Sequence, residues 1–531
     1  MKDRVELYDT TLRDGTQMEG ISLSVDDKLK IARRMDELGV HYIEGGYPGS
    51  NPKDIEFFAR MSEMNLKNAR LAAFGSTRKA GGRADTDPNL KALIEAKTPV
   101  VTIVAKAHDR HVTHVLETTL EENLAMIGDS VRHLKEAGGT VFLDAEHFFD
   151  GLEANRDYAL QCLQTAAKAG ADAVVLCDTN GGTITSRISE VVRAVVKEVS
   201  CEVGIHTHNG ADVAVAGSLA AIEAGATQVQ GSANGYGDMC GNANLFSIIA
   251  NLKLKLGIDV VSDDQLARLT EVAHYVAEIA NQPPHPRQAY VGSAAFVHKA
   301  GLHAAAVAKE EWSYQHVEPE RVGNTNRFLI SELAGIGNVV RKLHERGIDV
   351  SLDQARSIRD RIKEKEALGW QYEGAEASFE LLVRRMLGEY KPPFEITSHK
   401  VTIEPGRRLD PQTGEREYIA AVRMTVMVRK NDREWKGHAD HEGVGPVDAL
   451  DKALRAAIVG QYPGIASLRL TDFKVHIIDS HHSTEAVTRV LIESAAGEYN
   501  WWTVGTSPNI IEASLMALVD SYEYWFLQFQ K

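Results

Sequence analysis

The chain has 531 residues, a hydrophobic content of 44%, a charged content of 25% and a formal net charge of −15. These fractions are typical of a globular protein, and the length allows roughly two to four domains. The acidic balance argues against a nucleic acid or an anionic membrane as partner, because both are bound by basic surfaces.

The cysteines and the N-terminus exclude several further classes. Cys162, Cys177, Cys201 and Cys240 form no CxxC pair, so neither a disulfide framework nor a four-thiolate zinc site is expected. The start, MKDRVELYD, lacks an apolar signal core, and no stretch approaches the roughly 18 apolar residues of a membrane span. These features favour a cytoplasmic protein.

The first half of the chain alternates short β-rich runs with amphipathic stretches of helical period. Eight such runs extend from VELYDTT to ATQVQGSANGYG, which ends near residue 235. Eight strand–helix units over about 250 residues predict an α/β fold of the (β/α)8 barrel type. A doubly wound open sheet is the structural alternative. We expect a catalytic barrel over residues 1–285.

Two proline-rich segments, NQPPHPRQAYVG and EYKPPFEI, predict boundaries beyond the barrel. Residues 286–394 have helical period, including SAAFVHKAGLHAAAVAKE at 293–310, and are expected to form helical linker subdomains. Residues 395–531 change to strand patterns and contain two related segments, EWKGHADHEGVGPVDALDKALRAAI and NWWTVGTSPNIIEASLMALVDSY. This predicts a C-terminal α+β regulatory domain with an internal βββα repeat. The repeat either receives a small effector or only builds a core and a dimer contact.

Polar residues follow the predicted strands at their carboxyl ends, which meet at one mouth of a barrel. His206 and His208 are two apart in a strand pattern and therefore point to the same face. Asp14 follows the first run, across the barrel seam, and Asn242 follows the eighth. Two imidazoles, a carboxylate and an amide oxygen suit Mn²⁺, Mg²⁺ or Zn²⁺. Two octahedral positions stay free, which an α-keto acid can fill by chelation.

A guanidinium beside such a site indicates carbon–carbon bond formation. Condensation at a polarised ketone needs an enolate, and Arg13 is placed to stabilise its negative charge. Glu44, at the end of the second run, is expected to hold Arg13 in a bidentate pair; a plain structural salt bridge is the alternative. Glu146, at the end of the fifth run, is the candidate base within the barrel. His303 and Tyr314 are candidates from outside it.

Several motifs together resemble a known family. DTTLRDGTQMEG with Glu44 downstream, HTHNG, GYGDMCGNANL and FVHKAGLHAAA are similar to the barrel metalloenzymes that include α-isopropylmalate, homocitrate and citramalate synthases. EGGYPGSNPKDIEFF and DAEHFFDG resemble most the bacterial citramalate synthase branch. The resemblance covers essentially the whole chain. It implies condensation of acetyl-CoA with pyruvate and water to (R)-citramalate and CoA in isoleucine biosynthesis. It also implies a homodimer and isoleucine feedback at the C-terminal domain.

The resemblance further implies roles for individual residues. Asp14, His206, His208 and Asn242 are expected to bind the metal, with Arg13, Asp14, Glu44 and Thr179 around the substrate and Thr179 on the keto acid's carboxylate. Glu146, His303 and Tyr314 are expected to serve proton transfer and thioester hydrolysis, the last two from the partner subunit.

The chain departs from the family pattern at three places. Gly210 follows HTHN where the family usually has Asp, Tyr47 replaces a more frequent Trp, and GLHAAA lacks a polar residue often found there. If the missing Asp orients a metal ligand, metal affinity is expected to be weaker.

Three alternative functions remain open. An α-isopropylmalate synthase would take 2-ketoisovalerate in leucine biosynthesis, and only pocket volume separates the two acceptors. A cleavage like that of 3-hydroxy-3-methylglutaryl-CoA lyase would use the same metal and arginine in reverse, but needs no domain past residue 395. A non-catalytic sensor on the same scaffold would be expected to lose Arg13 or a metal ligand, and all are present.

Overall fold

A computed structural model describes residues 4–49, 51–298, 306–307, 310–328, 336–409, 416–478 and 486–530. The chain divides into two compact units. Unit 1 comprises Met1–Phe296 and Gln315–Asn326, and unit 2 comprises Val297–Tyr314 and Arg327–Lys531.

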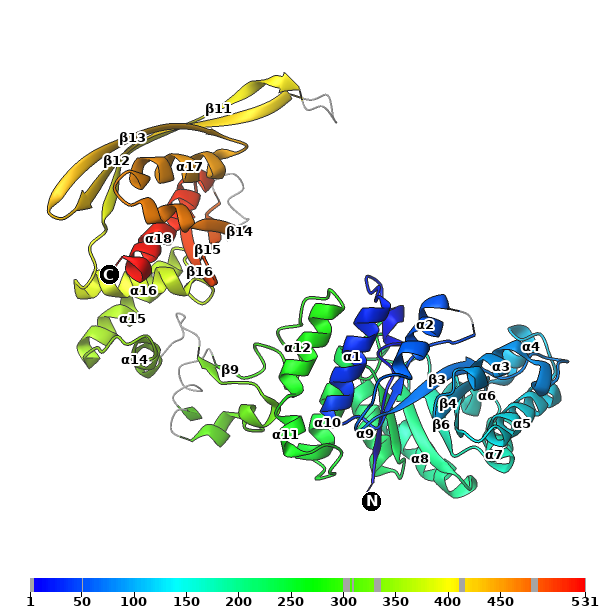
Figure 1. Ribbon diagram of the computed structural model, residues 1–531. Helices are drawn as coiled ribbons and strands as arrows, with labels where there is room; N and C mark the ends of the chain where they lie inside the picture. Colours follow the sequence, from blue (N-terminus) through cyan, green and yellow to red (C-terminus); the bar gives the residue numbers. More distant parts are fainter. Residues whose placement is uncertain are drawn as a thin grey trace. The chain divides into compact units, whose positions relative to one another are not determined.

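Unit 1 is a closed barrel of eight parallel strands in chain order, which confirms the predicted (β/α)8 architecture (Figure 1). The strands are β1 (Glu6–Asp9), β2 (Tyr42–Glu44), β3 (Arg70–Ser76), β4 (Val100–Lys106), β5 (Thr140–Glu146), β6 (Ala173–Asp178), β7 (Glu202–Thr207) and β8 (Gln228–Gly231). Because β1 pairs with β8, with Glu6 opposite Gln228, the sheet has no free edge and the open-sheet alternative is excluded.

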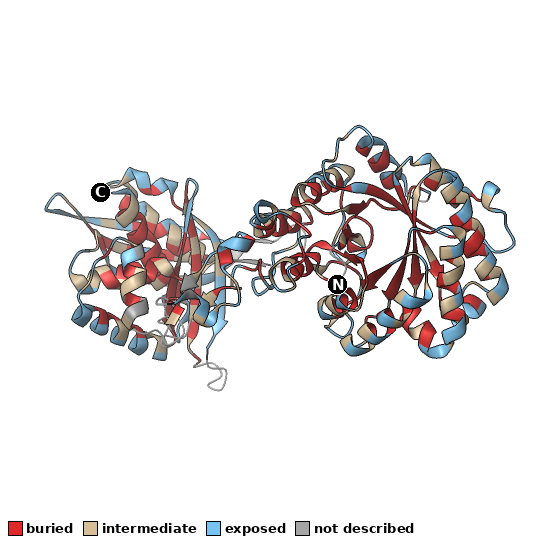
Figure 2. Ribbon diagram, turned by 90° about the horizontal axis from the view of Figure 1, so that it is seen from below, coloured by how far each residue is buried: buried red, intermediate tan, exposed pale blue. Residues whose placement is uncertain are grey.

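Helices surround the barrel and present apolar faces to it. They are α1 (Val25–Leu38), α2 (Pro52–Met61), α3 (Pro88–Glu95), α4 (Asp109–His114), α5 (Leu120–Glu136), α6 (Phe148–Ala154), α7 (Arg156–Ala169), α8 (Thr185–Glu198), α9 (Ala214–Glu223), α10 (Leu245–Leu254), α11 (Asp263–Leu266) and α12 (Leu269–Ile279). α1 begins at a capping box between Ser24 and Asp27 and ends at Gly39, whose φ of 95° stops the helix. In Figure 2 the strands of the barrel are buried and the outer helix faces are exposed.

The interior of the barrel changes from apolar to polar along the strands. Tyr8, Tyr42, Ala72, Val100, Phe142 and Ala173 form one buried cluster inside the barrel. Side chains two positions apart share a face of a strand. The next inward positions on β2, β4 and β5 are therefore Glu44, Thr102 and Asp144, all buried. The apolar cluster thus forms a floor beneath a polar layer at the carboxyl ends of the strands.

From residue 336 on, unit 2 consists of helices followed by two antiparallel sheets. The helices are α14 (Ile336–Glu345), α15 (Leu352–Ala367) and α16 (Glu376–Leu387). The first sheet, β11 (Phe394–Leu409), β12 (Arg416–Lys430) and β13 (Arg433–Gly443), is followed by α17 (Pro446–Val459). The second sheet, β14 (Arg469–Ile477), β15 (Thr488–Ala496) and β16 (Tyr499–Ser507), is followed by α18 (Ile510–Phe529). This order confirms the predicted βββα repeat.

Of the helix predicted over 293–310, the described residues show only 306–307 as helical. Residues 293–296 form a turn, and β9 (Val297–His298) pairs in parallel with β10 (Arg327–Phe328). The pairing partner lies about thirty residues further along the chain, so a local periodicity could not reveal it. Among the described helices, none is both long and apolar enough to span a bilayer.

Candidate metal centre and active site

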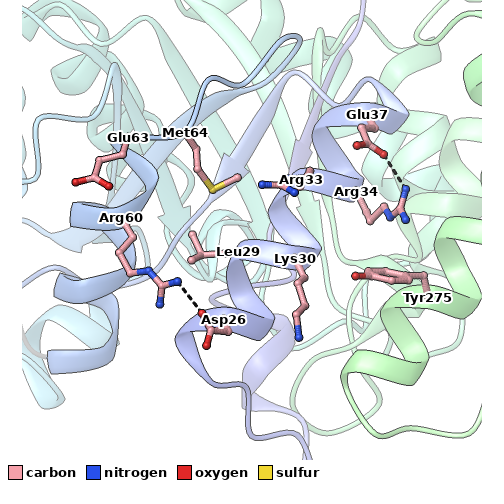
Figure 3. A pocket seen from close by; sticks show the side chains of 10 residues that line it. All are labelled: Asp26, Leu29, Lys30, Arg33, Arg34, Glu37, Arg60, Glu63, Met64 and Tyr275. Atoms are coloured by element: carbon pink, nitrogen blue, oxygen red, sulfur yellow. Dashed lines mark hydrogen bonds and ion pairs between the residues drawn. The ribbon is translucent and has the colours of Figure 1, made fainter.

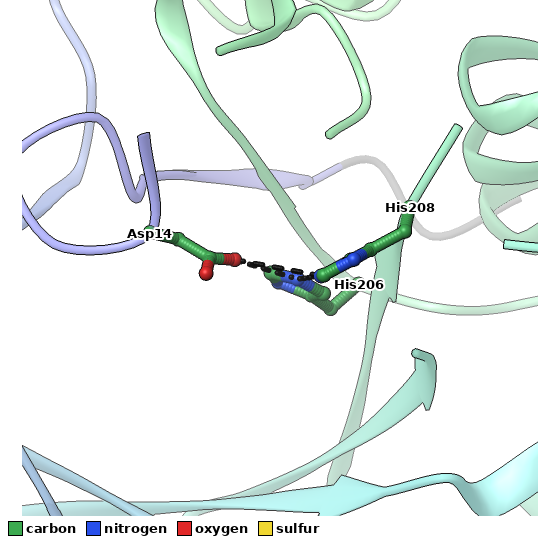
Figure 4. A group of neighbouring side chains, drawn as sticks. All are labelled: Asp14, His206 and His208. Carbon is green, nitrogen blue, oxygen red and sulfur yellow. Dashed lines mark hydrogen bonds and ion pairs between the residues drawn. The ribbon is translucent and has the colours of Figure 1, made fainter. Parts of the chain in front are cut away.

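Asp14, His206 and His208 meet at the carboxyl end of the barrel (Figure 4). His206 lies in β7, His208 directly follows it, and Asp14 lies in the turn after β1. Nε2 of His206 is 3.1 Å from Nε2 of His208. Oδ2 of Asp14 is 3.2 Å from Nε2 of His206 and 3.6 Å from Nε2 of His208. The structure therefore brings the three predicted ligands together.

The spacing and charge of this cluster fit a divalent cation. Neighbouring ligands of an octahedral ion at about 2.1 Å lie roughly 3 Å apart, close to the distances above. Burial disfavours the ionised form of Asp14, but the charge of Arg13 and the contacts with both histidines outweigh it and hold the pKa of Asp14 well below its usual range. In the described part of the chain, this is the one group of His, Cys, Asp or Glu whose ligand atoms lie close enough together for a single ion.

Asn242, the fourth predicted ligand, lies against Asp14. Its Nδ2 donates to Oδ2 of Asp14 at 2.8 Å, and a backbone bridge joins it to His208. Its Oδ1 is buried without a hydrogen-bond partner among the described residues. Burying an amide oxygen unpaired costs free energy. A half-turn of the amide would exchange Nδ2 and Oδ1 and bring the oxygen beside Asp14. In that position the oxygen fits the role of a ligand to a cation.

Arg13 is held beside the cluster from three sides. Its Nη1 lies 2.9 Å from Oδ1 of Asp14, its Nε donates to Oε2 of Glu44 at 2.6 Å, and its guanidinium stacks 3.9 Å from the ring centre of Phe74. The other oxygen of Glu44 accepts from the hydroxyl of Tyr8 at 2.8 Å. The pair is thus a single hydrogen bond in place of the predicted bidentate one, because Tyr8 takes the second oxygen.

Thr179 and Glu146 lie at the ends of the neighbouring strands β6 and β5. Oγ1 of Thr179 accepts from the backbone N–H of His147 at 2.8 Å, and His147 has a left-handed conformation with φ 57°. The carboxylate of Glu146 pairs with the ammonium of Lys106 at the end of β4. Both residues lie at the mouth, but the ion pair of Glu146 is with Lys106 and not with the metal cluster.

The two candidates outside the barrel stay predictions. His303 lies outside the described residues. Tyr314 belongs to unit 2 and is 46% exposed there.

The structure adds three residues that sequence reasoning missed. Nδ1 of His206 lies 2.8 Å from Oε1 of Gln230, whose Nε2 donates to Oδ1 of Asp144 at 3.1 Å. Burial, reinforced by the charge of Glu44, raises the pKa of Asp144 to about 7. Nδ1 of His208 lies 3.4 Å from Oδ1 of Asp238. The one sequence signal for these residues was the alternation of Asp144 and Glu146 in FLDAEH on β5.

Steric contact explains why position 210 is a glycine. A Cβ on Gly210 would lie 2.6 Å from the carbonyl oxygen of Asn180. A Cβ on Gly181 would in turn lie 2.5 Å from the backbone nitrogen of Gly210. The loops that follow β6 and β7 therefore touch through their backbones, and no side chain fits between them. The carboxylate near His208 comes from Asp238 instead.

Three cavities lie near these elements. One of about 290 Å³ opens beside Arg13 and is lined by Thr16, Gln17 and Tyr47 among others. A second, of about 660 Å³, lies between α1, α2 and α12 (Figure 3) and contains none of the predicted site residues. The charges of the arginines that line this second cavity are partly neutralised, since Arg60 pairs with Asp26 and Arg34 with Glu37. A third, of about 480 Å³, is lined by Lys106 and Glu146. The first and the third cavity are therefore the ones that extend the active site.

Comparison with known proteins covers nearly the whole chain. Residues 4–276 match the family described as HMGL-like, 290–368 a homocitrate synthase post-HMGL domain and 373–526 the LeuA allosteric (dimerisation) domain. The chain is 49% identical to the (R)-citramalate synthase of Aquifex aeolicus, over 99% of this chain and 98% of that one. It is 48% identical to that of Streptomyces coelicolor over the same shares. A probable 2-isopropylmalate synthase of Methanopyrus kandleri is 32% identical over 98% of each chain.

Proposed function

We propose, since the chain belongs to the HMGL-like family, that it is a metal-dependent enzyme that condenses acetyl-CoA with pyruvate to (R)-citramalate. The observation that carries this proposal is the near-half identity, over almost the entire chain, to relatives named (R)-citramalate synthase. In the reaction, the acetyl methyl group loses a proton and its carbon bonds to the keto carbon of pyruvate. The π electrons of the keto group pass to its oxygen, which takes up a proton and becomes the hydroxyl group of the product. Water then hydrolyses the thioester and releases CoA. The product fits isoleucine biosynthesis.

Asp14, His206, His208 and Asn242 form the binding site for a divalent cation in this proposal. The convergence of the first three side chains and the unpaired Oδ1 of Asn242 support it. When bound, a cation such as Mn²⁺, Mg²⁺ or Zn²⁺ supplies a Lewis acid for the keto group.

Arg13 supplies fixed positive charge for the enolate of the acetyl group. The contacts with Glu44, Asp14 and Phe74 hold its guanidinium before substrate arrives. Because these groups need not reorganise as charge develops, the stabilisation acts in the transition state. Glu44 is then an orienting residue, and it accepts from Tyr8 as well.

Thr179 is suited to the keto acid's carboxylate. Its Oγ1 already accepts the N–H of His147, so the hydroxyl proton of Thr179 remains to be donated. A carboxylate oxygen is the acceptor that this proton fits.

Glu146 is the proposed base for the acetyl methyl group, and Lys106 holds its carboxylate at the mouth. His303 and Tyr314 are proposed for thioester hydrolysis, each acting at the partner's barrel. This role needs a homodimer, which the match to the LeuA dimerisation domain supports.

The domain organisation follows the same proposal. We assign residues 1–285 to the catalytic barrel, 286–394 to helical linker subdomains and 395–531 to an allosteric domain that binds isoleucine. The matches over 4–276 and 290–368 support the first boundary, whereas the match to the LeuA domain begins at residue 373, ahead of the proposed 395. A cytoplasmic location fits the substrates.

A release assay for free CoA tests the acceptor. Acetyl-CoA is offered with pyruvate, 2-ketobutyrate or 2-ketoisovalerate, with Mn²⁺ or Mg²⁺ and after chelation. We expect the highest kcat/KM with pyruvate, no turnover after chelation, and (R)-citramalate as product. Preference for 2-ketoisovalerate would replace the proposal by an isopropylmalate synthase. Absence of CoA release with every acceptor would overturn condensation.

The effector is tested through tryptophan fluorescence. All six tryptophans of the chain, from Trp312 to Trp525, belong to unit 2. We expect isoleucine, and not leucine, to change this emission and to lower turnover. If neither amino acid does either, residues 395–531 have no isoleucine site.

A further inference from the structure

We propose that Gln230 is a positioning residue that fixes the tautomer of His206, so that Nε2 is the nitrogen free to bind a cation. This inference rests on the metal site of the proposed function. It adds to that function a residue outside the predicted ligand set. The contacts that carry it lie in the buried polar layer of the barrel.

The strand register places Gln230 beside His206. β8 lies between β7 and β1, and Gln230 is paired with His206 on one side and with Tyr8 on the other. In parallel strands, residues at one level point to the same face. All three side chains therefore lie inside the barrel, where Gln230 is fully buried.

The amide of Gln230 has a defined orientation. Its Nε2 can only donate, and it points at Oδ1 of Asp144 at 3.1 Å. Asp144 lies on β5, so this hydrogen bond crosses the interior of the barrel. With Nε2 committed to a carboxylate oxygen, Oε1 faces Nδ1 of His206 at 2.8 Å.

The orientation of the amide decides where the proton of His206 sits. An amide oxygen only accepts, so Nδ1 of His206 must carry the hydrogen. The lone pair is then on Nε2, which is the nitrogen that faces Asp14 and His208. The reversed amide would donate to Nδ1 and move the proton to Nε2, where it would block a cation.

The two histidines differ in the partner that faces Nδ1. Nδ1 of His208 faces Asp238 at 3.4 Å, and the side chain of Asp238 is 42% exposed. The support of His206 is a short, fully buried contact. Outer partners of this kind typically change metal affinity by about 10–100-fold when they are removed. We therefore expect the larger effect at Gln230.

Three variants separate the hydrogen bond from simple packing. Gln230→Met keeps the volume and removes the acceptor, whereas Gln230→Glu keeps an acceptor for His206. Gln228→Met is the matched control. Gln228 is a buried glutamine on the same strand, with only a 3.5 Å contact to Nε2 of Gln230 and none to His206 among its hydrogen bonds in the structure.

Binding of Mn²⁺ to the full-length, metal-stripped protein is measured by calorimetry without either substrate. An error in the acceptor assignment therefore leaves this test untouched. We expect Gln230→Met to weaken binding at least tenfold, Gln228→Met to stay within about threefold of the parent, and Gln230→Glu to bind at least tenfold tighter than Gln230→Met. Unchanged binding in Gln230→Met, equal loss in Gln228→Met, or no recovery in Gln230→Glu would overturn the proposal.

A second measurement does not depend on any Gln230 variant folding. Nitrogen-15 NMR of histidine-labelled, metal-free protein distinguishes the two neutral tautomers, and a His206→Gln sample identifies the signal. We expect the parent to carry hydrogen on Nδ1 of His206, at a pH where the ring is neutral. A spectrum with the hydrogen on Nε2 would disprove the inference directly.

Discussion

Nε of Arg13 lies 2.6 Å from Oε2 of Glu44, and both side chains are almost completely buried. Burial disfavours the charge of Arg13, but Glu44 and Asp14 outweigh it and raise the pKa of Arg13 well above its ordinary value. The guanidinium is therefore a permanent charge beside the predicted metal ligands.

Replacing Arg13 separates charge stabilisation from metal binding. We expect Arg13→Lys to lower kcat by about 10²–10³, because an ammonium cannot reproduce the planar contacts of the guanidinium. Mn²⁺ should still bind, since no predicted ligand is lost. Steady-state kinetics and calorimetry check the two parts. Arg70→Lys, at the exposed start of β3, is the control. Loss of Mn²⁺ binding in Arg13→Lys would show that Arg13 supports the ligands instead.

Glu146 tests the assignment of the base. Glu146→Gln removes the proton acceptor and keeps the size, so we expect kcat to fall by about 10²–10⁴ while Mn²⁺ affinity is unchanged. Glu136→Gln, at the exposed end of α5, is the matched control. A kcat within threefold of the parent would remove Glu146 from the chemistry.

Gly210 tests the contact between two loops of the mouth. In Gly210→Ala the new methyl group meets the carbonyl oxygen of Asn180 at 2.6 Å, so the backbone next to His208 must shift. We expect a loss of about 1–3 kcal/mol in stability and weaker Mn²⁺ binding. Gly182→Ala, with open space around its Cβ, should change neither. Chemical denaturation measures the stability and calorimetry the Mn²⁺ binding. Equal stability and equal binding in the two variants would contradict the packing argument.

Unit 2 is expected to lose stability as the pH rises. Burial raises the pKa of Glu523 to about 7 despite the opposing charge of Arg385, whereas an unfolded glutamate titrates near 4.3. The folded state therefore binds this proton more tightly. The contribution is complete below about pH 4 and is lost as the pH rises through about 7.

Glu523→Gln keeps the side chain uncharged at every pH. At pH 8 we expect it to stabilise unit 2 by about 1–3 kcal/mol, with the advantage gone near pH 4. Denaturation followed by tryptophan fluorescence measures unit 2 alone, and Glu498→Gln, exposed between β15 and β16, is the control. A variant less stable than the parent at pH 8 would mean that the ion pair with Arg385 outweighs burial.

The barrel was predictable because its evidence is local and repeated. Each strand lies within one β-rich run, and the alternation of HTH predicted that His206 and His208 share a face. Gln230 and Asp144 were missed because their roles depend on which residues face each other across the barrel, and a lone glutamine in a strand gives no chemical signal. The short pairing of β9 with β10 was missed for the same reason, since a non-local partner took the place of a helix at Val297–His298.

The backbone contact between Gly181 and Gly210 has a consequence for engineering. One of the two loops follows Thr179 and the other follows His208. Because no side chain lies between them, a shift of one loop shifts the other. A graft that reshapes the acceptor pocket through only one loop would displace the other. Exchange of acceptor preference between related enzymes should therefore succeed only when both segments are transplanted as a matched pair.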